Sequence, residues 1–115
     1  MTVSSYNKLV KANQLVLILF YNNWCMWSRK MLPAFDKAAD LIRNKFKPPG
    51  TALLAKVECD KNVKLCKTFK IKQYPTAILV NHSTKINKEY KNKRSEKAIV
   101  NFMKKHIKMS TQKRK

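Results

Sequence analysis

Residues 15–21, Leu-Val-Leu-Ile-Leu-Phe-Tyr, form a continuous apolar run near the start of the chain. A run of β-prone residues without a polar interruption is typical of a central strand that is buried on both faces of a sheet. Residues 5–14 have apolar positions at helical spacing, which predicts a short amphipathic helix before this strand. The same spacing predicts a long helix over residues 28–46, which the breaker sequence at 47–50 ends.

The second half of the chain continues the alternation of strands and helices. Its pattern predicts a strand at 51–59, a short helix from Asp60 or Asn62 to residue 69, strands at 76–80 and 85–91, and a final helix capped by Ser95. The strand–helix–strand order implies a parallel pair joined by a right-handed crossover. With a short first strand expected at residues 2–3, this order predicts an α/β domain with a mixed central sheet and helices on both faces. We assign the domain to residues 1–109 and a frayed basic tail to residues 110–115.

The net charge of +20, from 26 Lys and Arg against six Asp and Glu, adds a strongly cationic surface to this picture. Half of the net charge lies in residues 82–115. Such a surface can hold an acidic protein surface, and less readily nucleic acid or an anionic membrane, although charge runs more often form a plain solvated face. No apolar run approaches the roughly 20 residues of a membrane span. The N-terminus has no basic region followed by an apolar stretch, so no secretory signal is visible in this chain.

The candidate chemistry centres on Cys25, which follows the buried strand and precedes the long helix. Unpaired backbone N–H groups and the helix dipole stabilise a thiolate at such a position, so the cysteine becomes a better nucleophile. Arg29 and Lys30 add positive charge nearby. A lone cysteine is more often an inert core residue, but Trp24 and Trp27 on either side of Cys25 favour a reactive thiol.

Several short motifs occur in order along residues 3–109. They are Phe20-Tyr21-x-x-Trp24-Cys25-x-x-Ser28, Pro33 in the following helix, Val57-Glu58-Cys59-Asp60, Tyr74-Pro75-Thr76 and Tyr90. In combination they resemble the thioredoxin superfamily, and within it the protein disulfide isomerase family, most of all members whose Cys-x-x-Ser motif ends in serine. The resemblance implies a thioredoxin fold. For the serine-ending members it also implies retention and quality control of client proteins through mixed disulfides.

The resemblance gives Cys25 and Ser28 the two catalytic positions of the family's motif. A second thiol at position 28 would attack the mixed disulfide and release the partner, and serine cannot do so. Ser28 can still donate a hydrogen bond to the Cys25 thiolate. Leu19 matches the position of a buried acid that assists proton transfer in many relatives, and leucine cannot move a proton. Both departures favour capture without release, with a decayed site as the alternative.

The resemblance also implies a surface for bound clients. Tyr74-Pro75 matches the family's cis-proline loop, which lies beside the reactive cysteine and offers backbone hydrogen bonds to a peptide. Composition alone favours a trans bond, because only about 5–6% of X-Pro bonds in folded proteins are cis. Trp24, Met26, Trp27 and Ile71 can supply an apolar rim for unfolded clients, or they can pack inward.

Cys59 and Cys66 lie seven positions apart, at the end of a strand and in the short helix after it. Some relatives carry a structural disulfide at this spacing, so the resemblance implies a Cys59–Cys66 bond, with two reduced core thiols as the alternative. We expect no metal site, because a third and fourth ligand are missing nearby, and no motif indicates a cofactor. A bonded pair would leave Cys25 as the odd reactive thiol and would imply an oxidising compartment.

Asn81-His82-Ser83 is a sequon for N-glycosylation in an expected hairpin turn, with Asn81 as the candidate acceptor. Together with the disulfide it favours the endoplasmic reticulum lumen or secretory pathway over the cytoplasm. Because the chain has only one glycine, we expect left-handed backbone conformations at Asn81 and Asn92.

Three functional hypotheses follow from these residues. The first is a thiol-capturing chaperone domain that forms mixed disulfides with cysteine-bearing clients or oxidoreductases through Cys25. The second is a monothiol isomerase, in which a thiol of the client itself expels Cys25. The third sets thiol chemistry aside and makes the domain a basic binding module for an acidic partner.

Overall fold

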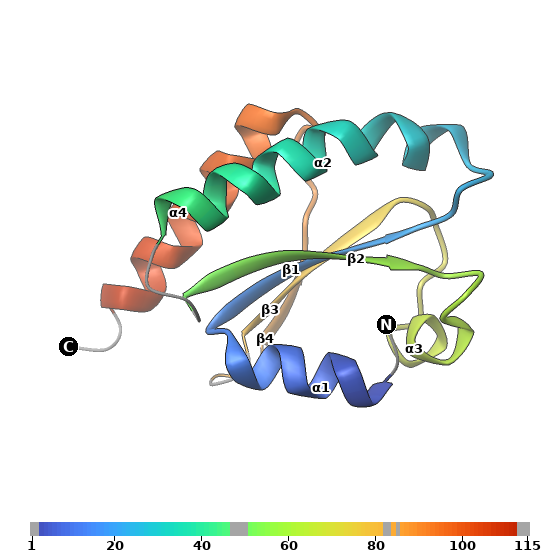
Figure 1. Ribbon diagram of the computed structural model, residues 1–115, viewed down its shortest axis with the longest axis horizontal. Helices are drawn as coiled ribbons and strands as arrows, with labels where there is room; N and C mark the ends of the chain where they lie inside the picture. The colour runs from blue at the N-terminus through green and yellow to red at the C-terminus, as the bar shows by residue number, and fades with distance from the viewer. Residues whose placement is uncertain (1–2, 47–50, 82–83, 85, 113–115) are drawn as a thin grey trace.

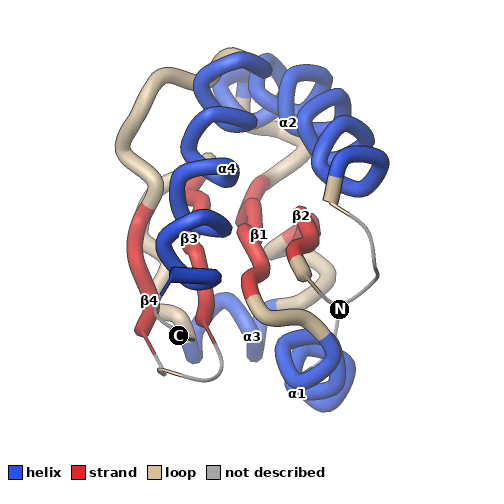
Figure 2. Tube along the Cα trace, turned by 90° about the vertical axis from the view of Figure 1, so that its left-hand side faces the viewer, coloured by secondary structure: helices blue, strands red, loops and turns tan. Residues whose placement is uncertain are grey.

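The computed structural model describes residues 3–46, 51–81, 84 and 86–112, and these form one mixed sheet with helices on both faces (Figure 1). The elements in chain order are α1 (Val3–Ala12), β1 (Leu15–Tyr21), α2 (Met26–Lys45), β2 (Ala52–Glu58), α3 (Val63–Thr68), β3 (Thr76–Asn81), β4 (Ile86–Glu89) and α4 (Glu96–Gln112). The strands lie side by side in the order β2-β1-β3-β4 (Figure 2). Strand β1 is parallel to β2 and antiparallel to β3, and β4 is antiparallel to β3. The predicted mixed sheet is confirmed.

Strand β1 is central because both of its faces are apolar. Side chains of successive residues in a strand point to opposite faces. Leu17 and Leu19 belong to the core cluster that includes Phe35 of α2 and Met103 of α4. Ile18 belongs to the second cluster, which includes residues of α1 and α3. Figure 1 shows α2 and α4 on one side of the sheet and α1 and α3 on the other, so the sheet has helices on both faces as expected.

The directions of the strands bring three distant segments to one edge of the sheet. Since β1 and β2 are parallel, the loop after Tyr21 and the turn after Glu58 leave the sheet at the same end. The Cys59 N–H donates a hydrogen bond to the Tyr21 carbonyl at 2.9 Å, which joins the two. Strand β3 runs the opposite way, with Thr76 beside Phe20, so the loop before β3 also lies at this end.

Some element boundaries differ from those expected. Helix α2 begins at Met26 rather than at Ser28, because Cys25 is its N-cap residue. Val3 begins helix α1, so the strand expected at residues 2–3 does not form there, and Thr2 lies outside the described residues. Strand β4 is shorter than expected. Helix α4 runs to Gln112 and therefore includes residues 110–112, which we assigned to a frayed tail.

The expected N-cap of the last helix is confirmed. The Ser95 Oγ accepts a hydrogen bond from the Ala98 N–H at 3.2 Å, as an N-cap residue does for the third residue of its helix. None of the helices in the described part of the chain is long and apolar enough to cross a membrane.

The left-handed backbone position falls on Lys70, not on Asn81 or Asn92. Lys70 has φ of 56° and is the non-glycine residue with positive φ in the described part of the chain. It follows the C-cap Phe69 of α3; its N–H bonds to the Lys67 carbonyl, and the Ile71 N–H bonds to the Cys66 carbonyl. These two bonds form a Schellman motif, whose left-handed residue is usually glycine. Asn81 instead continues strand β3.

Replacing Lys70 by glycine is expected to stabilise the protein by about 1 kcal/mol, because glycine lacks the Cβ that penalises a left-handed conformation. Lys67→Gly is the matched control, since the same change inside helix α3 should destabilise by about 1 kcal/mol. Urea unfolding of both variants measures the two effects. A Lys70→Gly variant that loses as much stability as Lys67→Gly would contradict this account of the helix end.

Candidate thiol exchange site

Cys25 is held at the N-terminus of α2 by backbone bonds on both sides. Its N–H donates to the Asn22 carbonyl at 3.3 Å, and its carbonyl accepts from the Arg29 N–H at 3.1 Å. The backbone is extended at the N-cap, with φ of −87° and ψ of 122°. Cys25 is a free, half-buried cysteine. As the N-cap residue, Cys25 lies next to the first helical turn, whose N–H groups have no partner within the helix.

The position lowers the pKa of the Cys25 thiol. The largest cause is the backbone N–H of Ser28, which favours the thiolate and is opposed by desolvation of the sulfur. The Trp27 backbone N–H, the Ser28 side chain and the positive charge of Arg94 lower the pKa further, in that order. A lower pKa increases the fraction of thiolate at neutral pH, and the thiolate is the nucleophile in disulfide exchange.

Ser28 lies beneath the thiol in the first turn of α2 and is fully buried. Its Oγ accepts a hydrogen bond from the Asn22 N–H at 3.3 Å. Asn22 and Ser28 are the two polar side chains buried in the described part of the chain, so buried polarity is confined to this site. The sequence did not single out Asn22, although a polar residue directly after a buried strand was a usable signal.

The core below the site offers no proton carrier. Leu19 is fully buried in β1, between Ala77 of β3 and Lys56 of β2 in the sheet register. No charged side chain is buried among the residues that the structure describes. The Ser28 hydroxyl is therefore the buried side-chain group that acts on the sulfur, beside the backbone N–H groups of Trp27 and Ser28.

The side chains that flank Cys25 are exposed rather than packed inward. Trp24, Met26 and Trp27 are 69%, 60% and 57% exposed. The Trp24 ring packs edge-on against Tyr74 at 6.2 Å between centroids, and the Lys30 Nζ lies 5.0 Å from the Trp27 ring centroid. Large apolar side chains that are open to solvent thus flank Cys25 in the chain.

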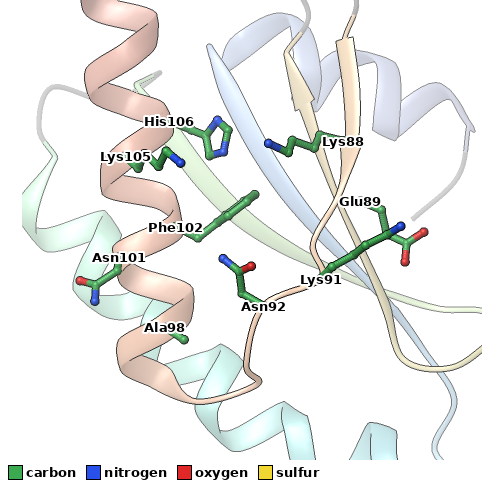
Figure 3. Close-up of a pocket in the computed structure, with 9 residues that line it drawn as sticks. All are labelled: Lys88, Glu89, Lys91, Asn92, Ala98, Asn101, Phe102, Lys105 and His106. Carbon is green, nitrogen blue, oxygen red and sulfur yellow. The ribbon is translucent and has the colours of Figure 1, made fainter.

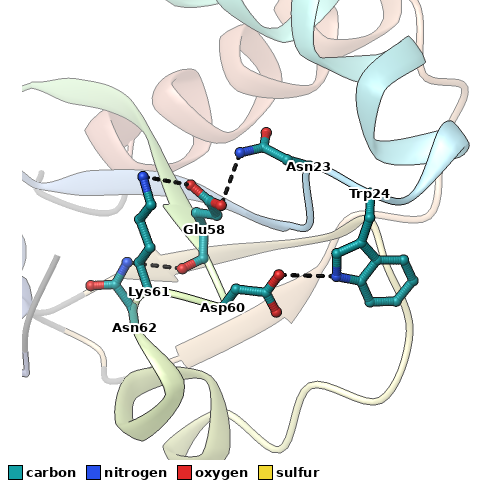
Figure 4. A network of polar contacts seen from close by, with 6 residues as sticks. All are labelled: Asn23, Trp24, Glu58, Asp60, Lys61 and Asn62. Atoms are coloured by element: carbon teal, nitrogen blue, oxygen red, sulfur yellow. Dashed lines mark hydrogen bonds and ion pairs between the residues drawn. The ribbon is translucent and has the colours of Figure 1, made fainter.

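Trp24 is held in place by a polar network that sequence reasoning missed (Figure 4). Its Nε1 donates to Asp60 Oδ2 at 2.9 Å. One residue earlier, Asn23 Nδ2 donates to Glu58 Oε1 at 2.8 Å, and Lys61 Nζ lies 3.7 Å from the other oxygen of that carboxylate. These partners are 35 and 36 positions apart in the chain, so only the fold brings them together.

The Tyr74-Pro75 peptide bond is cis, as the family resemblance implied. The carbonyl oxygen of Tyr74 lies 3.5 Å from the Cys25 Sγ and accepts the thiol hydrogen bond. Pro75 is buried and lines a cavity of about 250 Å³ that also borders Arg94. The predicted loop and the predicted thiol are therefore in contact.

The other two cysteines form a disulfide. Cys59 directly follows β2 and bonds to Cys66 of α3, with an S–S distance of 2.16 Å. Within the described residues, no three His, Cys, Asp or Glu side chains are grouped as a metal ion would require. The Asn81 Oδ1 accepts a hydrogen bond from the Thr84 N–H at 3.3 Å, and His82 and Ser83 of the sequon lie outside the described residues.

The sheet order, the thiol at a helix N-terminus and the cis-proline loop define a thioredoxin-fold domain. The thioredoxin family profile matches residues 1–105, so the chain belongs to the thioredoxin family. Its relatives are members of the protein disulfide isomerase family. Endoplasmic reticulum resident protein 44 of Homo sapiens is 28% identical over 97 residues, which cover 84% of this chain and 24% of that protein. Protein disulfide-isomerase 1 of Caenorhabditis elegans is 35% identical over 106 residues, which cover 91% of this chain and 21% of that protein.

Solved structures agree with the sequence relatives. The zinc-bound form of human ERp44 superposes with a TM-score of 0.85 at 25% identity, over 93% of this chain and 30% of that one. The first thioredoxin domain of mouse protein disulfide-isomerase A4 superposes with a TM-score of 0.77 at 21% identity, over 93% and 73% of the two chains. The chain thus spans about a quarter or less of the curated relatives described above.

Ser28→Ala is expected to raise the Cys25 pKa only slightly, because alanine keeps the backbone N–H that contributes most to the lowered value. The rate of alkylation by iodoacetamide as a function of pH gives the pKa of the thiol. The wild-type midpoint should lie below the usual range of a free cysteine, about 8.5.

Ser95→Ala removes the hydroxyl that caps helix α4 and should leave the Cys25 midpoint unchanged. If Ser28→Ala alone returned the midpoint to the range of a free cysteine, the Ser28 hydroxyl rather than the backbone N–H groups would be the main cause of the lowered pKa.

Proposed function

We propose that this domain captures client proteins of the secretory pathway as mixed disulfides on Cys25 and holds them until another thiol releases them. The main observation behind the proposal is the free, half-buried thiol of Cys25, whose pKa is lowered. Buried Ser28 stands at the position where relatives with a dithiol motif have their second cysteine. The similarity to ERp44 and to protein disulfide isomerases supports it.

The chemistry of capture needs no oxidant. The Cys25 thiolate attacks one sulfur of a client disulfide, so that a new S–S bond forms and the old one breaks. The second client sulfur leaves as a thiolate and takes a proton from solvent. The number of disulfide bonds is unchanged. Because Ser28 cannot attack the new bond, the adduct persists until an external thiol displaces Cys25.

The surroundings of Cys25 suit an unfolded or partly folded client. The exposed side chains of Trp24, Met26 and Trp27 offer apolar area to a segment that has lost its own core. The backbone of the Tyr74-Pro75 loop lies beside the sulfur and can pair with an extended peptide. Together these groups would orient a client cysteine toward Cys25.

An oxidising compartment fits the same proposal. The Cys59–Cys66 disulfide supports the endoplasmic reticulum lumen or secretory pathway over the cytoplasm, since disulfides rarely persist in the cytosol. The name of ERp44 as an endoplasmic reticulum resident protein supports the same location. A sequon at Asn81 would be available to glycosylation there.

A monothiol isomerase would use the same first step, with a client thiol in place of the external thiol. The two functions differ in turnover. A holder binds one client per domain, whereas an isomerase reactivates scrambled ribonuclease in molar excess over itself. The half-buried position of Cys25 and the absence of a buried proton carrier among the described residues favour the holder.

Cys25→Ala should abolish the mixed disulfides that rapid acid quenching traps in the oxidising compartment of cells. Ser28→Cys should reduce trapped adducts by roughly tenfold or more and confer insulin reductase activity, because it restores a resolving thiol. Ser28→Ala is the matched control and should retain the adducts. Non-reducing electrophoresis with mass spectrometry measures all three.

The opposite result would identify a different function. If Cys25→Ala recovered the same partners as the wild type, and moderate salt released them, the domain would be an electrostatic binding module and the capture proposal would be wrong.

A further inference from the structure

A pocket of about 400 Å³ lies between strand β4 and helix α4, apart from the residues that surround Cys25. Figure 3 shows its lining side chains. They come from β4, from the loop that follows it and from α4, and they are Lys88, Glu89, Lys91, Asn92, Ala98, Asn101, Phe102, Lys105 and His106. The volume is in the range of small-molecule sites.

The pocket carries positive charge that no nearby carboxylate neutralises. Lys88 contributes from one side and Lys105 from the other, whereas Glu89 is the one acid of the lining and the Lys91 side chain extends toward the Glu89 side in Figure 3. In Figure 3 the Glu89 carboxylate points away from the space between β4 and α4. The ion pairs within the described residues involve Arg43, Lys56 and Lys61 and leave these lysines out.

The positive charge of the pocket affects the pKa of His106. Burial is the first cause that lowers the pKa of its imidazole, followed by the charges of Lys88 and Lys105. Its ring packs on Phe102 with 4.5 Å between centroids, and Phe102 in turn meets Tyr90 edge-on at 4.8 Å. These aromatic contacts fix the ring while the two lysines disfavour its protonation.

The arrangement fits an anion. Two ammonium groups and an imidazole from opposite walls point into the same space, and the Asn92 side chain adds an amide (Figure 3). A bound anion would offset the mutual repulsion of these groups and accept several hydrogen bonds with charged donors. The oxygens of a phosphate group are suited to such a cluster, since each can accept from more than one donor.

We propose that the pocket between β4 and α4 binds a small phosphate-bearing anion through Lys88, Lys105 and His106. This pocket is separate from the thiol at Cys25. A bound anion would neutralise part of the chain's excess positive charge. Binding places negative charge beside His106 and therefore favours its protonated form. The anion should accordingly bind more tightly as the pH falls through the titration range of His106.

The test uses the full chain, with pyrophosphate as the probe and sodium chloride to hold the ionic strength constant. Histidine ring signals in NMR spectra, with His106 assigned from His106→Gln, follow the titration. Without the probe, the His106 pKa should lie below its ordinary value, about 6.5. Saturation with pyrophosphate should raise it, and inorganic phosphate should do the same at higher concentration.

Lys88→Gln combined with Lys105→Gln should weaken pyrophosphate binding by about tenfold or more, because it removes two charged donors. The same double variant should raise the His106 pKa in the absence of the probe. Lys8→Gln combined with Lys11→Gln is the matched control. It removes the same charge from exposed positions of α1 and should leave the binding nearly unchanged.

Three results would overturn the proposal. One is an equal shift of His106 with sodium chloride alone at the same ionic strength. A second is an equal loss of affinity in the α1 control. The third is binding of an acidic peptide or an oligonucleotide without any binding of pyrophosphate, which would make the face a docking surface for a macromolecule. Unchanged alkylation of Cys25 in the double variant checks that the fold is intact and separates this test from that of thiol capture.

Discussion

The burial of β1 on both faces is the interaction on which the rest of the structure depends. Its side chains alternate between two apolar clusters, one under α2 and α4 and the other under α1 and α3. With β2 parallel on one side and β3 antiparallel on the other, the strand fixes where three loops leave the sheet. Cys25, Cys59 and Pro75 lie on those loops, so the position of the site is a consequence of the position of this strand.

The lowered pKa of Cys25 has its largest cause in the backbone. The N–H groups of the first turn of α2 stabilise the thiolate, and the Ser28 hydroxyl and the Arg94 charge add less. A site built in this way keeps an activated nucleophile even when the second cysteine and the buried acid are replaced by serine and leucine. In the proposed function, this separation would allow capture without resolution.

The excess positive charge affects the pKa values of individual groups near helix α4. Burial and then the charges of Lys88 and Lys105 lower the pKa of His106. A side-chain hydrogen bond with Lys45, followed by repulsion from its charge, lowers the pKa of Lys104. Most other lysines are exposed and solvated. The charge therefore has local physical consequences on and beside α4, at a distance from the chemistry of the thiol.

The sequence by itself determined the order of the elements, the central strand and the N-cap Ser95, because periodicity and capping are local properties. The motif resemblance supplied the fold, the cis bond before Pro75 and the Cys59–Cys66 pair, which spacing alone left open. Only the tertiary structure decided which groups meet across the chain. The Trp24–Asp60 bond and the pocket at His106 join residues from separate elements. Such contacts depend on how the elements pack, so no local sequence pattern predicts them.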